Sequence, residues 1–340
     1  MSTTYRALVA HAAGDLRVER RTQRTPEAHE AVVAVDYGGI CGSDLHYWSS
    51  GAVGESVLRA PMVLGHEVSG HVVTAAADGS GPAEGTPVTV HPATPCEQCG
   101  LCREGRQNLC PHTSYLGSAA RVPHTDGAFA ERYVVAARRL LPLPGGLPVR
   151  TAALAEPASV AWHAVSRAGA VAGRRVLVVG AGPIGLLVVA VLRRAGAREI
   201  VVSDLRERPL SVARELGATA THLGAPPEDL EAEVAIDSSG AAAGVRSAVL
   251  ASRRGGHLVL LGLPPSPEQP FPTGLVATRE LTVAGSFRFH AELADVVAAL
   301  ADGSLHVDSV LSHEFGLDEA ERAFAVARDA ATSSKVLLRF

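Results

Sequence analysis

The distribution of apolar residues divides the chain into two parts with different periodicities. From residue 151 to 287, short β-branched runs alternate with longer segments whose apolar residues recur at helical spacing. This alternation predicts a doubly wound parallel sheet in an α/β domain. The predicted strands lie within 175–179, 199–204, 233–240, 255–263 and 280–287, and predicted helices within 208–218 and 241–252.

The first 150 residues follow a different pattern, in which short strand-like runs are separated by Gly and Pro. EAVVAVDYG, EVSGHVVTAA and TPVTVHP are the clearest of these runs, and they predict a β-rich domain. With 340 residues, the chain is too long for one average core. We therefore expect a β-rich domain over 1–150 and a doubly wound α/β domain over 151–287. Residues 288–340, with a helix in AELADVVAALADG and a strand in SKVLLRF, are expected to return to the first domain.

Composition narrows the class of protein. The chain carries 31 basic and 35 acidic residues, a net charge of −4, which argues against a nucleic-acid partner because phosphates require a basic surface. Its longest apolar run, 176–192, contains a Gly-rich turn and is shorter than the ~20 residues of a membrane span. The N-terminus lacks a long apolar segment of the secretory type. We expect a cytoplasmic protein without a membrane partner.

Four of the five cysteines lie close together with the spacing C-x2-C-x2-C-x7-C. They are Cys96, Cys99, Cys102 and Cys110. In a reducing compartment such a cluster indicates a metal rather than disulfides, and four thiolates close a tetrahedral shell. The spacing predicts a structural zinc site. Four unrelated loop thiols are the plain alternative, and a nucleic-acid zinc finger would need basic partners and a recognition helix.

The fifth cysteine belongs to a second candidate metal site. Cys41 lies in GGICGSDLHYW, His66 and Glu67 lie in APMVLGHEVSGHVV, and Glu156 lies in ALAEPASVAWHA. One Cys, one His and one carboxylate can hold zinc with a fourth position open to water or substrate. Each residue taken singly has an ordinary structural or surface explanation, so the prediction depends on its combination with the next motif.

The run RRVLVVGAGPIGLLVVAVL predicts a dinucleotide-binding turn. A strand leads into Gly180-x-Gly182-x-x-Gly185 and then into an apolar helix. The glycines allow a tight turn, close approach of a pyrophosphate and close packing of helix on strand. Asp204 ends the next strand and suits the ribose hydroxyls of NAD. The candidate cofactor-binding residues are Gly180, Gly182, Pro183, Ile184, Gly185, Asp204 and Arg206.

Over its whole length the chain resembles the zinc-dependent medium-chain alcohol dehydrogenases. GHEVSGHVV, the four-cysteine segment and VLVVGAGPIG occur in that family's order and spacing. Glu156-Pro157, where other alcohol dehydrogenases carry a cysteine, is similar to sorbitol dehydrogenase and other polyol enzymes. ICGSDLHYW, PHTDGAFAERY and GSFRFHAEL resemble the bacterial L-idonate 5-dehydrogenases. The resemblance implies a GroES-like catalytic domain joined to a Rossmann domain.

The resemblance also implies roles for individual residues. Cys41, His66 and Glu156 would hold the catalytic zinc, with Glu67 able to exchange roles with Glu156. Asp44 would hydrogen-bond the far nitrogen of His66 and so fix its tautomer. Two further residues would move the proton of the substrate alcohol: Ser43 would accept it and His46 would pass it toward solvent. A capping Ser43, a surface His46 and a salt-bridged Asp44 are the alternatives.

Further residues bear on how substrate and cofactor are bound. Tyr47 and Arg288 are the candidate substrate-binding residues, and a structural salt bridge is the alternative for Arg288. Lys335 is expected at the surface, with a contact to the cofactor phosphates as its alternative. Asp204 favours NAD, whereas Arg206 with its neighbour Arg208 would suit NADP.

The predicted reaction interconverts a secondary alcohol and a ketone on a polyol or sugar acid. L-idonate, oxidised to 5-keto-D-gluconate, is the predicted substrate, and a sorbitol-, xylitol- or amino-alcohol dehydrogenase is the alternative. The expected cofactors are one catalytic and one structural Zn²⁺ with NAD or NADP, in a homo-oligomer of two or four chains. A zinc-free quinone reductase would lack Cys41 and His66, and a non-catalytic nucleotide sensor would lack the open zinc site.

Overall fold

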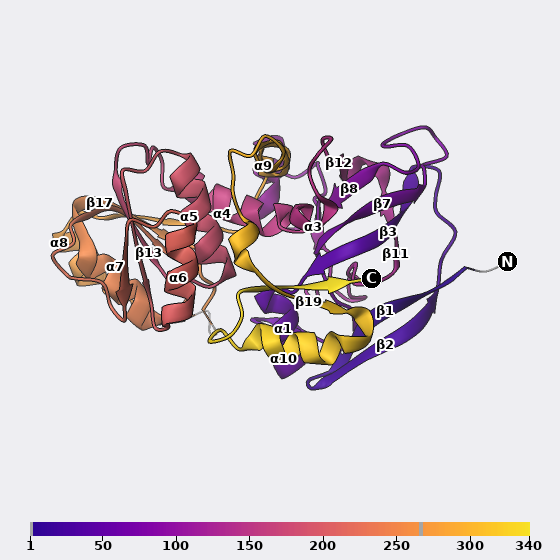
Figure 1. Cartoon of the computed structure of the whole chain (residues 1–340), viewed down its shortest axis with the longest axis horizontal. Coiled ribbons are helices and arrows are strands. Elements are labelled where there is room, and N and C mark those ends of the chain that lie inside the picture. Colours follow the sequence, from indigo (N-terminus) through magenta and orange to yellow (C-terminus); the bar gives the residue numbers. More distant parts are fainter. Residues whose placement is uncertain (1–2, 265–267) are drawn as a thin grey trace.

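The computed structural model describes residues 3–264 and 268–340. Figure 1 shows two lobes side by side along the long axis, with helices α4 (Ala155–Arg167) and α9 (Glu292–Ala301) between them. One lobe is built on a six-stranded sheet and the other on a seven-stranded sheet. No helix in the described part of the chain combines the length and apolar character that crossing a membrane requires.

The six-stranded sheet is parallel throughout and has the order β15-β14-β13-β16-β17-β18. Its strands are β13 (Arg175–Val179), β14 (Glu199–Asp204), β15 (Ala220–Leu223), β16 (Ala232–Asp237), β17 (Ser252–Leu260) and β18 (Thr282–Gly285). The order reverses between β13 and β16, which is where open α/β sheets bind ligands. This confirms the predicted doubly wound sheet. Only β15 lacked a sequence prediction, because its four residues ATHL are too few to show a pattern.

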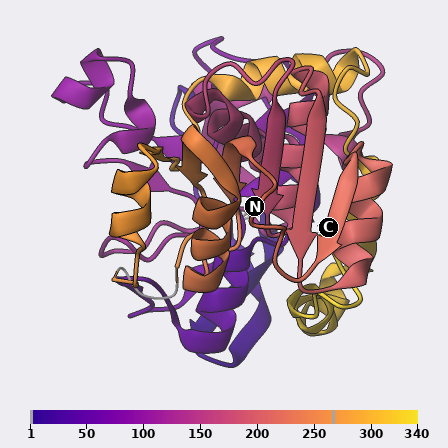
Figure 2. The same ribbon diagram turned by 90° about the vertical axis from the view of Figure 1, so that its left-hand side faces the viewer.

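Helices cover both faces of this sheet (Figure 2). Val176 and Val178 are buried in one apolar cluster with α5 (Pro183–Arg194) and α6 (Glu207–Glu215). Their neighbours Leu177 and Val179 are buried in a second cluster with α7 (Ala242–Ala251) and α8 (Thr273–Thr278). Because successive side chains point to opposite faces and both faces are covered, the strand is apolar at every position. That is why it appears in the sequence as an uninterrupted run.

The seven-stranded sheet has the order β12-β8-β7-β3-β20-β19, and β11 pairs with the opposite half of β3. Its strands are β3 (Glu30–Gly39), β7 (Glu67–Thr74), β8 (Pro87–Val90), β11 (Arg132–Ala136), β12 (Leu140–Pro142), β19 (Leu311–Gly316) and β20 (Lys335–Arg339). The three runs predicted as strands in this lobe form β3, β7 and β8. A smaller sheet places β1 (Thr4–Ala12) between β2 (Asp15–Thr22) and β6 (Met62–Val63).

Several shorter elements complete the part of the fold described here. They are α1 (Gly42–Ser50), α2 (Gly100–Arg103), α3 (Val149–Ala152), α10 (Ala320–Arg328) and the two-stranded pairs β4 (Ala52–Val53) with β5 (Ser56–Val57) and β9 (Ala93–Thr94) with β10 (Ser114–Tyr115). In Figure 1 the yellow C-terminal segment lies against α1, and α10 contacts α1 and β20.

The C-terminal residues divide between the two lobes. β20 pairs antiparallel with β3 inside the seven-stranded sheet. The helix α9, predicted to accompany it, instead packs against α4, where Leu293, Val296 and Val297 join the apolar cluster of the six-stranded sheet. This segment therefore ties the lobes together, and its strand brings Lys335 next to the residues described below.

Candidate active site

Three of the predicted metal ligands meet where β3 and β7 end side by side. Cys41 follows β3, and His66 and Glu67 stand at the start of β7, whose register pairs Gly39 with Glu67. One donor atom from each of Cys41, His66 and Glu67 lies within 4.8 Å of the others. A Cβ atom on Gly39 would lie 2.2 Å from Oε2 of Glu67, so only glycine leaves room for this carboxylate.

Glu156 lies beside this group but outside it. Its carboxylate, in the first turn of α4, accepts a hydrogen bond of 2.6 Å from the Tyr115 hydroxyl. The Tyr115 ring in turn contacts His66 edge-on, with 5.6 Å between ring centroids. Burial raises the pKa of Glu156 to about 7. Tyr115 was not identified from the sequence, since nothing in its spacing marks it.

The electrostatics of the site favour a cation. Burial alone lowers the pKa of His66, but the Cys41 thiolate, Asp44 and Glu156 outweigh it and raise this pKa to about 10. The His66 Nδ1 atom is buried and has no hydrogen-bond partner among the described residues. The Cys41 thiol, the His66 imidazole and the Glu67 carboxylate, whose donor atoms meet here, are ligand types that zinc prefers. The residues present therefore fit a zinc ion.

Asp44 does not make the hydrogen bond to His66 that the sequence predicts. Its Oδ1 lies 3.9 Å from Nδ1 of His66, which is too long for a hydrogen bond. The buried carboxylate instead accepts hydrogen bonds from the backbone N–H groups of Cys41, at 3.0 Å, and Gly65, at 3.1 Å. Asp44 thus fastens the two loops that present the thiol and the imidazole.

Lys335 is the clearest correction. The sequence predicts a surface lysine or a contact to cofactor phosphates, yet its side chain is 2% exposed. Its Nζ donates hydrogen bonds to Oε1 and Oε2 of Glu67, both at 2.7 Å, and to the Ile40 carbonyl at 3.1 Å. A charged lysine is buried here because Glu67 supplies its counter-ion.

The other predicted residues of this segment lie on α1. Ser43 is partly buried two residues beyond Cys41, and His46 is exposed. Tyr47 is buried in the core cluster, and its hydroxyl oxygen accepts a hydrogen bond of 2.9 Å from the Ala119 backbone. Tyr47 therefore supports the loop around residue 119 rather than lining the cavity next to it.

The four clustered cysteines come together as the spacing predicts, and all five cysteines are free thiols. Sγ of Cys110 lies 3.5 Å from that of Cys96 and 3.9 Å from that of Cys99. Four sulfurs around a zinc ion with bonds of about 2.3 Å would stand about 3.8 Å apart, so this cluster also fits zinc. The Gln98 backbone N–H is the main cause that lowers the pKa of Cys96 to about 6, which favours its thiolate.

The glycine-rich turn has the geometry of a dinucleotide site at the switch point of the sheet. Gly180 adopts φ +91°, and a Cβ atom there would lie 2.9 Å from the Ser239 backbone nitrogen. A Cβ atom on Gly185 would lie 2.0 Å from the Gly180 carbonyl oxygen, whereas one on Gly182 would meet nothing within 4 Å. The open space above Gly182, at the N-terminus of α5, fits a pyrophosphate.

Asp204 is joined to this turn. Its Oδ2 accepts a hydrogen bond of 2.8 Å from the Ala181 backbone, and its Oδ1 accepts one of 2.9 Å from the Arg206 backbone. The Arg206 side chain is exposed. The carboxylate is therefore fixed beside the turn, while Arg206 stands outside it.

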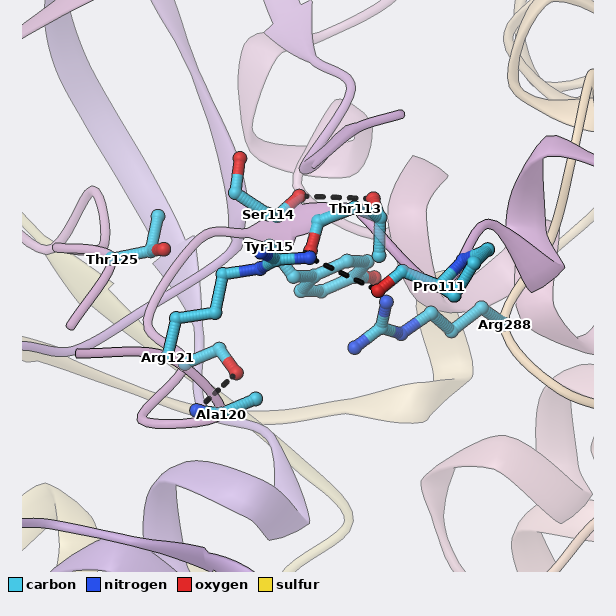
Figure 3. Close-up of a pocket in the computed structure, with 9 residues that line it drawn as sticks. Pro111, Thr113, Ser114, Tyr115, Ala120, Arg121, Thr125 and Arg288 are labelled. Carbon is cyan, nitrogen blue, oxygen red and sulfur yellow. Dashed lines mark hydrogen bonds between the residues drawn. The ribbon is translucent and has the colours of Figure 1, made fainter. Parts of the chain in front are cut away.

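A cavity of about 360 Å³ adjoins Tyr115, and Arg288 forms part of its lining (Figure 3). The Arg288 guanidinium lies over the Tyr115 ring, 4.0 Å from its centroid. Tyr115, which lines the cavity and donates its hydroxyl hydrogen bond to Glu156, is the residue that the cavity and the candidate metal site share. Arg288 forms no salt bridge within residues 3–264 and 268–340. The alternative prediction, that Arg288 belongs to a structural ion pair, is therefore not supported by these residues.

Comparison with known proteins places the chain in a family. An alcohol dehydrogenase GroES-like domain matches residues 27–145, and a zinc-binding dehydrogenase domain matches residues 183–302. L-idonate 5-dehydrogenase (NAD(P)(+)) of Escherichia coli is 36% identical over 317 residues, which are 91% of each chain. The chain belongs to the zinc-binding alcohol dehydrogenase family. The resemblance seen in the sequence is thereby confirmed.

One further relative and one solved structure place this zinc-binding dehydrogenase near polyol and sugar-acid enzymes. Sorbitol dehydrogenase of Gallus gallus is 36% identical and covers 95% of this chain and 93% of its own. The crystal structure of L-idonate 5-dehydrogenase from Escherichia coli superposes with a TM-score of 0.95 at 34% identity, covering 100% of this chain and 99% of that one. The predicted two-domain architecture, GroES-like and Rossmann, is confirmed.

Proposed function

We propose that this protein is a zinc- and NAD(P)-dependent dehydrogenase that oxidises a secondary hydroxyl of a polyol or sugar acid. Its proposed reaction is the oxidation of L-idonate to 5-keto-D-gluconate. The observation that carries the proposal is the meeting of Cys41, His66 and Glu67 beside Glu156, next to a cavity that Arg288 lines. The names of the Escherichia coli and Gallus gallus relatives support the substrate class.

Cys41 and His66 would hold the catalytic zinc, together with Glu67 or Glu156. Cys96, Cys99, Cys102 and Cys110 would hold a structural zinc, and the glycine-rich turn would hold the dinucleotide. When bound, zinc supplies Lewis-acid polarisation of a hydroxyl oxygen, and NAD(P)⁺ supplies a hydride acceptor. Asp44 orients this set by fastening the loops of Cys41 and His66.

The remaining roles belong to the side chains of α1 and of the cavity. Ser43 would accept the proton of the substrate hydroxyl, and His46, which is exposed, would release it to solvent. Arg288 would bind the carboxylate of a sugar acid through paired hydrogen bonds. Asp204 would accept hydrogen bonds from the ribose hydroxyls, which favours NAD.

The test is an absorbance assay of NAD(P)H formation with a panel of polyols, sugar acids and their keto forms. We expect L-idonate and 5-keto-D-gluconate to give higher kcat/KM than sorbitol and xylitol. Turnover of sorbitol or xylitol, with no turnover of L-idonate or 5-keto-D-gluconate, would favour the polyol alternative, which the similarity to the Gallus gallus sorbitol dehydrogenase supports. Turnover of neither class would reject the proposal.

Three predictions of the sequence remain predictions. They are the division into 1–150, 151–287 and 288–340, a cytoplasmic location, and a homo-oligomer of two or four chains. The separation of the two large sheets and the domain match over 27–145 support the boundary near 150. The other domain match extends to residue 302 and α9 packs on α4, so the boundary at 287 has no such support.

A further inference from the structure

The cavity beside Tyr115 contains a second arginine that the reaction described above does not use. Figure 3 shows Arg121 and Arg288 entering the cavity from opposite sides in this view. The rest of the lining is polar or small, with hydroxyl groups from Thr113, Ser114, Ser118 and Thr125. Two cations and several hydroxyls therefore face one space, and no acidic residue belongs to the lining.

Neither guanidinium has an acidic partner in the part of the chain that the structure describes. Elsewhere in the molecule arginines do pair, as Arg175 does with Glu199 at 2.5 Å. Arg288 is partly buried although it has no such partner, and this burial lowers its pKa. A cleft lined by one sign of charge attracts the opposite sign, because low-dielectric walls concentrate the field.

Arg121 is held in place by the backbone that surrounds the cavity. Its Nε donates to the Thr113 carbonyl at 2.9 Å and its Nη2 to the Pro111 carbonyl at 3.1 Å. Its own carbonyl is 2.7 Å from Nδ1 of His124, whose Nε2 accepts a hydrogen bond of 2.8 Å from the Arg59 backbone. The two hydrogen bonds to Thr113 and Pro111 fix the guanidinium of this exposed residue, and Nη1, which makes no hydrogen bond to the described residues, is available to a ligand.

We propose that Arg121 and Arg288 form one anion-binding subsite, which takes the terminal oxyanion of an open-chain substrate and makes Arg121 a specificity-determining residue. The oxyanion is a carboxylate or a phosphate, since a guanidinium binds either through paired hydrogen bonds. This proposal rests on the proposed function, because it places the reacting hydroxyl at the Cys41–His66 site and the anion at the far end of the same ligand.

The first experiment measures discrimination between substrates. Arg121→Gln is expected to lower the ratio of kcat/KM for L-idonate to kcat/KM for sorbitol about tenfold, the typical effect of losing one charged hydrogen bond. Arg121→Lys, which keeps the charge but not the paired geometry, is expected to give an intermediate ratio. Arg20→Gln on β2 makes the same change of charge on an exposed arginine outside the cavity, and its ratio is expected to equal that of the wild type.

The second experiment is independent of turnover and so separates this proposal from the proposed function. Calorimetric titration of the zinc-loaded, NAD-bound protein with gluconate, and separately with sorbitol 6-phosphate, measures binding of the two kinds of oxyanion. We expect both arginine-to-glutamine variants, at 121 and at 288, to weaken binding of the preferred anion about tenfold. Tighter binding of gluconate identifies a carboxylate subsite, and tighter binding of the phosphate identifies a phosphate subsite.

The outcomes divide cleanly. Weaker anion binding in Arg121→Gln supports the subsite even if the substrate panel gives no turnover, in which case only the proposed reaction fails. Equal binding of each anion by the wild type and by Arg121→Gln overturns the subsite, whatever the enzyme oxidises. Circular dichroism of each variant tests whether it is folded. If Arg121→Gln does not fold, the same comparison is made with Arg121→Lys.

Discussion

Lys335 and Glu67 form a buried ion pair although 268 residues separate them in the chain, with Nζ at 2.7 Å from both carboxylate oxygens. The pairing of β20 with β3 brings them together, since Lys335 begins β20 and β3 ends beside Glu67. The ammonium group neutralises a carboxylate that also belongs to the Cys41–His66 group. Burial alone lowers the pKa of Lys335, but Glu67, together with Cys41 and Glu156, outweighs it, and the pKa is raised.

Lys335→Met should therefore be strongly destabilising, because it removes the ammonium counter-ion from the buried Glu67 carboxylate. We expect the free energy of unfolding to fall by about 3–5 kcal/mol. Urea denaturation of the zinc-loaded protein measures it. The matched control is Arg322→Met, which breaks the exposed pair with Glu319 and should cost less than about 1 kcal/mol. Similar losses in the two variants would contradict a structural role for the buried pair.

Purified protein should contain two zinc ions per chain. Cys96→Ser opens the four-thiolate shell and should lose one zinc together with thermal stability, because that shell closes the loop around residues 96–110. Cys41→Ser should lose the other zinc and all turnover, with little change in the melting temperature. Metal analysis by mass spectrometry and thermal melting decide the matter. One zinc per wild-type chain, or two variants that behave alike, would show that the sites are not distinct.

Two glycines of the dinucleotide turn should respond differently to the same substitution. Gly185→Ala places a Cβ atom 2.0 Å from the Gly180 carbonyl and should destabilise the fold by about 1–3 kcal/mol. Gly182→Ala meets nothing within 4 Å at φ −63°, so the fold should keep its stability. Its methyl group should occupy the pyrophosphate space and weaken NAD binding about tenfold or more. Thermal melting and a fluorescence titration with NADH measure both effects; unchanged binding in Gly182→Ala would place the pyrophosphate elsewhere.

Cofactor choice should depend on the charge of Asp204. The wild type is expected to prefer NAD, because a 2′-phosphate would meet this carboxylate. Asp204→Asn, which removes the charge and keeps an oxygen acceptor, should raise the NADP-to-NAD ratio of kcat/KM about tenfold. Glu207→Gln removes a nearby charge that is paired with Arg214 and serves as the control. A tenfold preference of the wild type for NADP would reverse the assignment and make Arg206 the deciding residue.

The sequence by itself determined the parts of this protein that depend on local spacing. The strand–turn–helix of Gly180, Gly182 and Gly185 and the four clustered cysteines are encoded within short segments, so their geometry follows from neighbours in the chain. The covered sheet was predictable for the same reason, because burial on both faces makes each strand an apolar run. Cys41 and His66 could be grouped from the sequence by their ligand types in combination with the dinucleotide motif, and the family resemblance strengthened that grouping.

The tertiary structure alone decided which distant side chains meet. A lysine at the start of a strand-like run carries no sign that it is buried, and only the pairing of β20 with β3 assigns it to Glu67. Tyr115, at the end of β10, likewise meets Glu156 of α4, and Arg121 lines the cavity, although no periodicity marks either residue. The helix α9 joined α4 rather than the first sheet, because an amphipathic pattern shows that a face is buried but not against what.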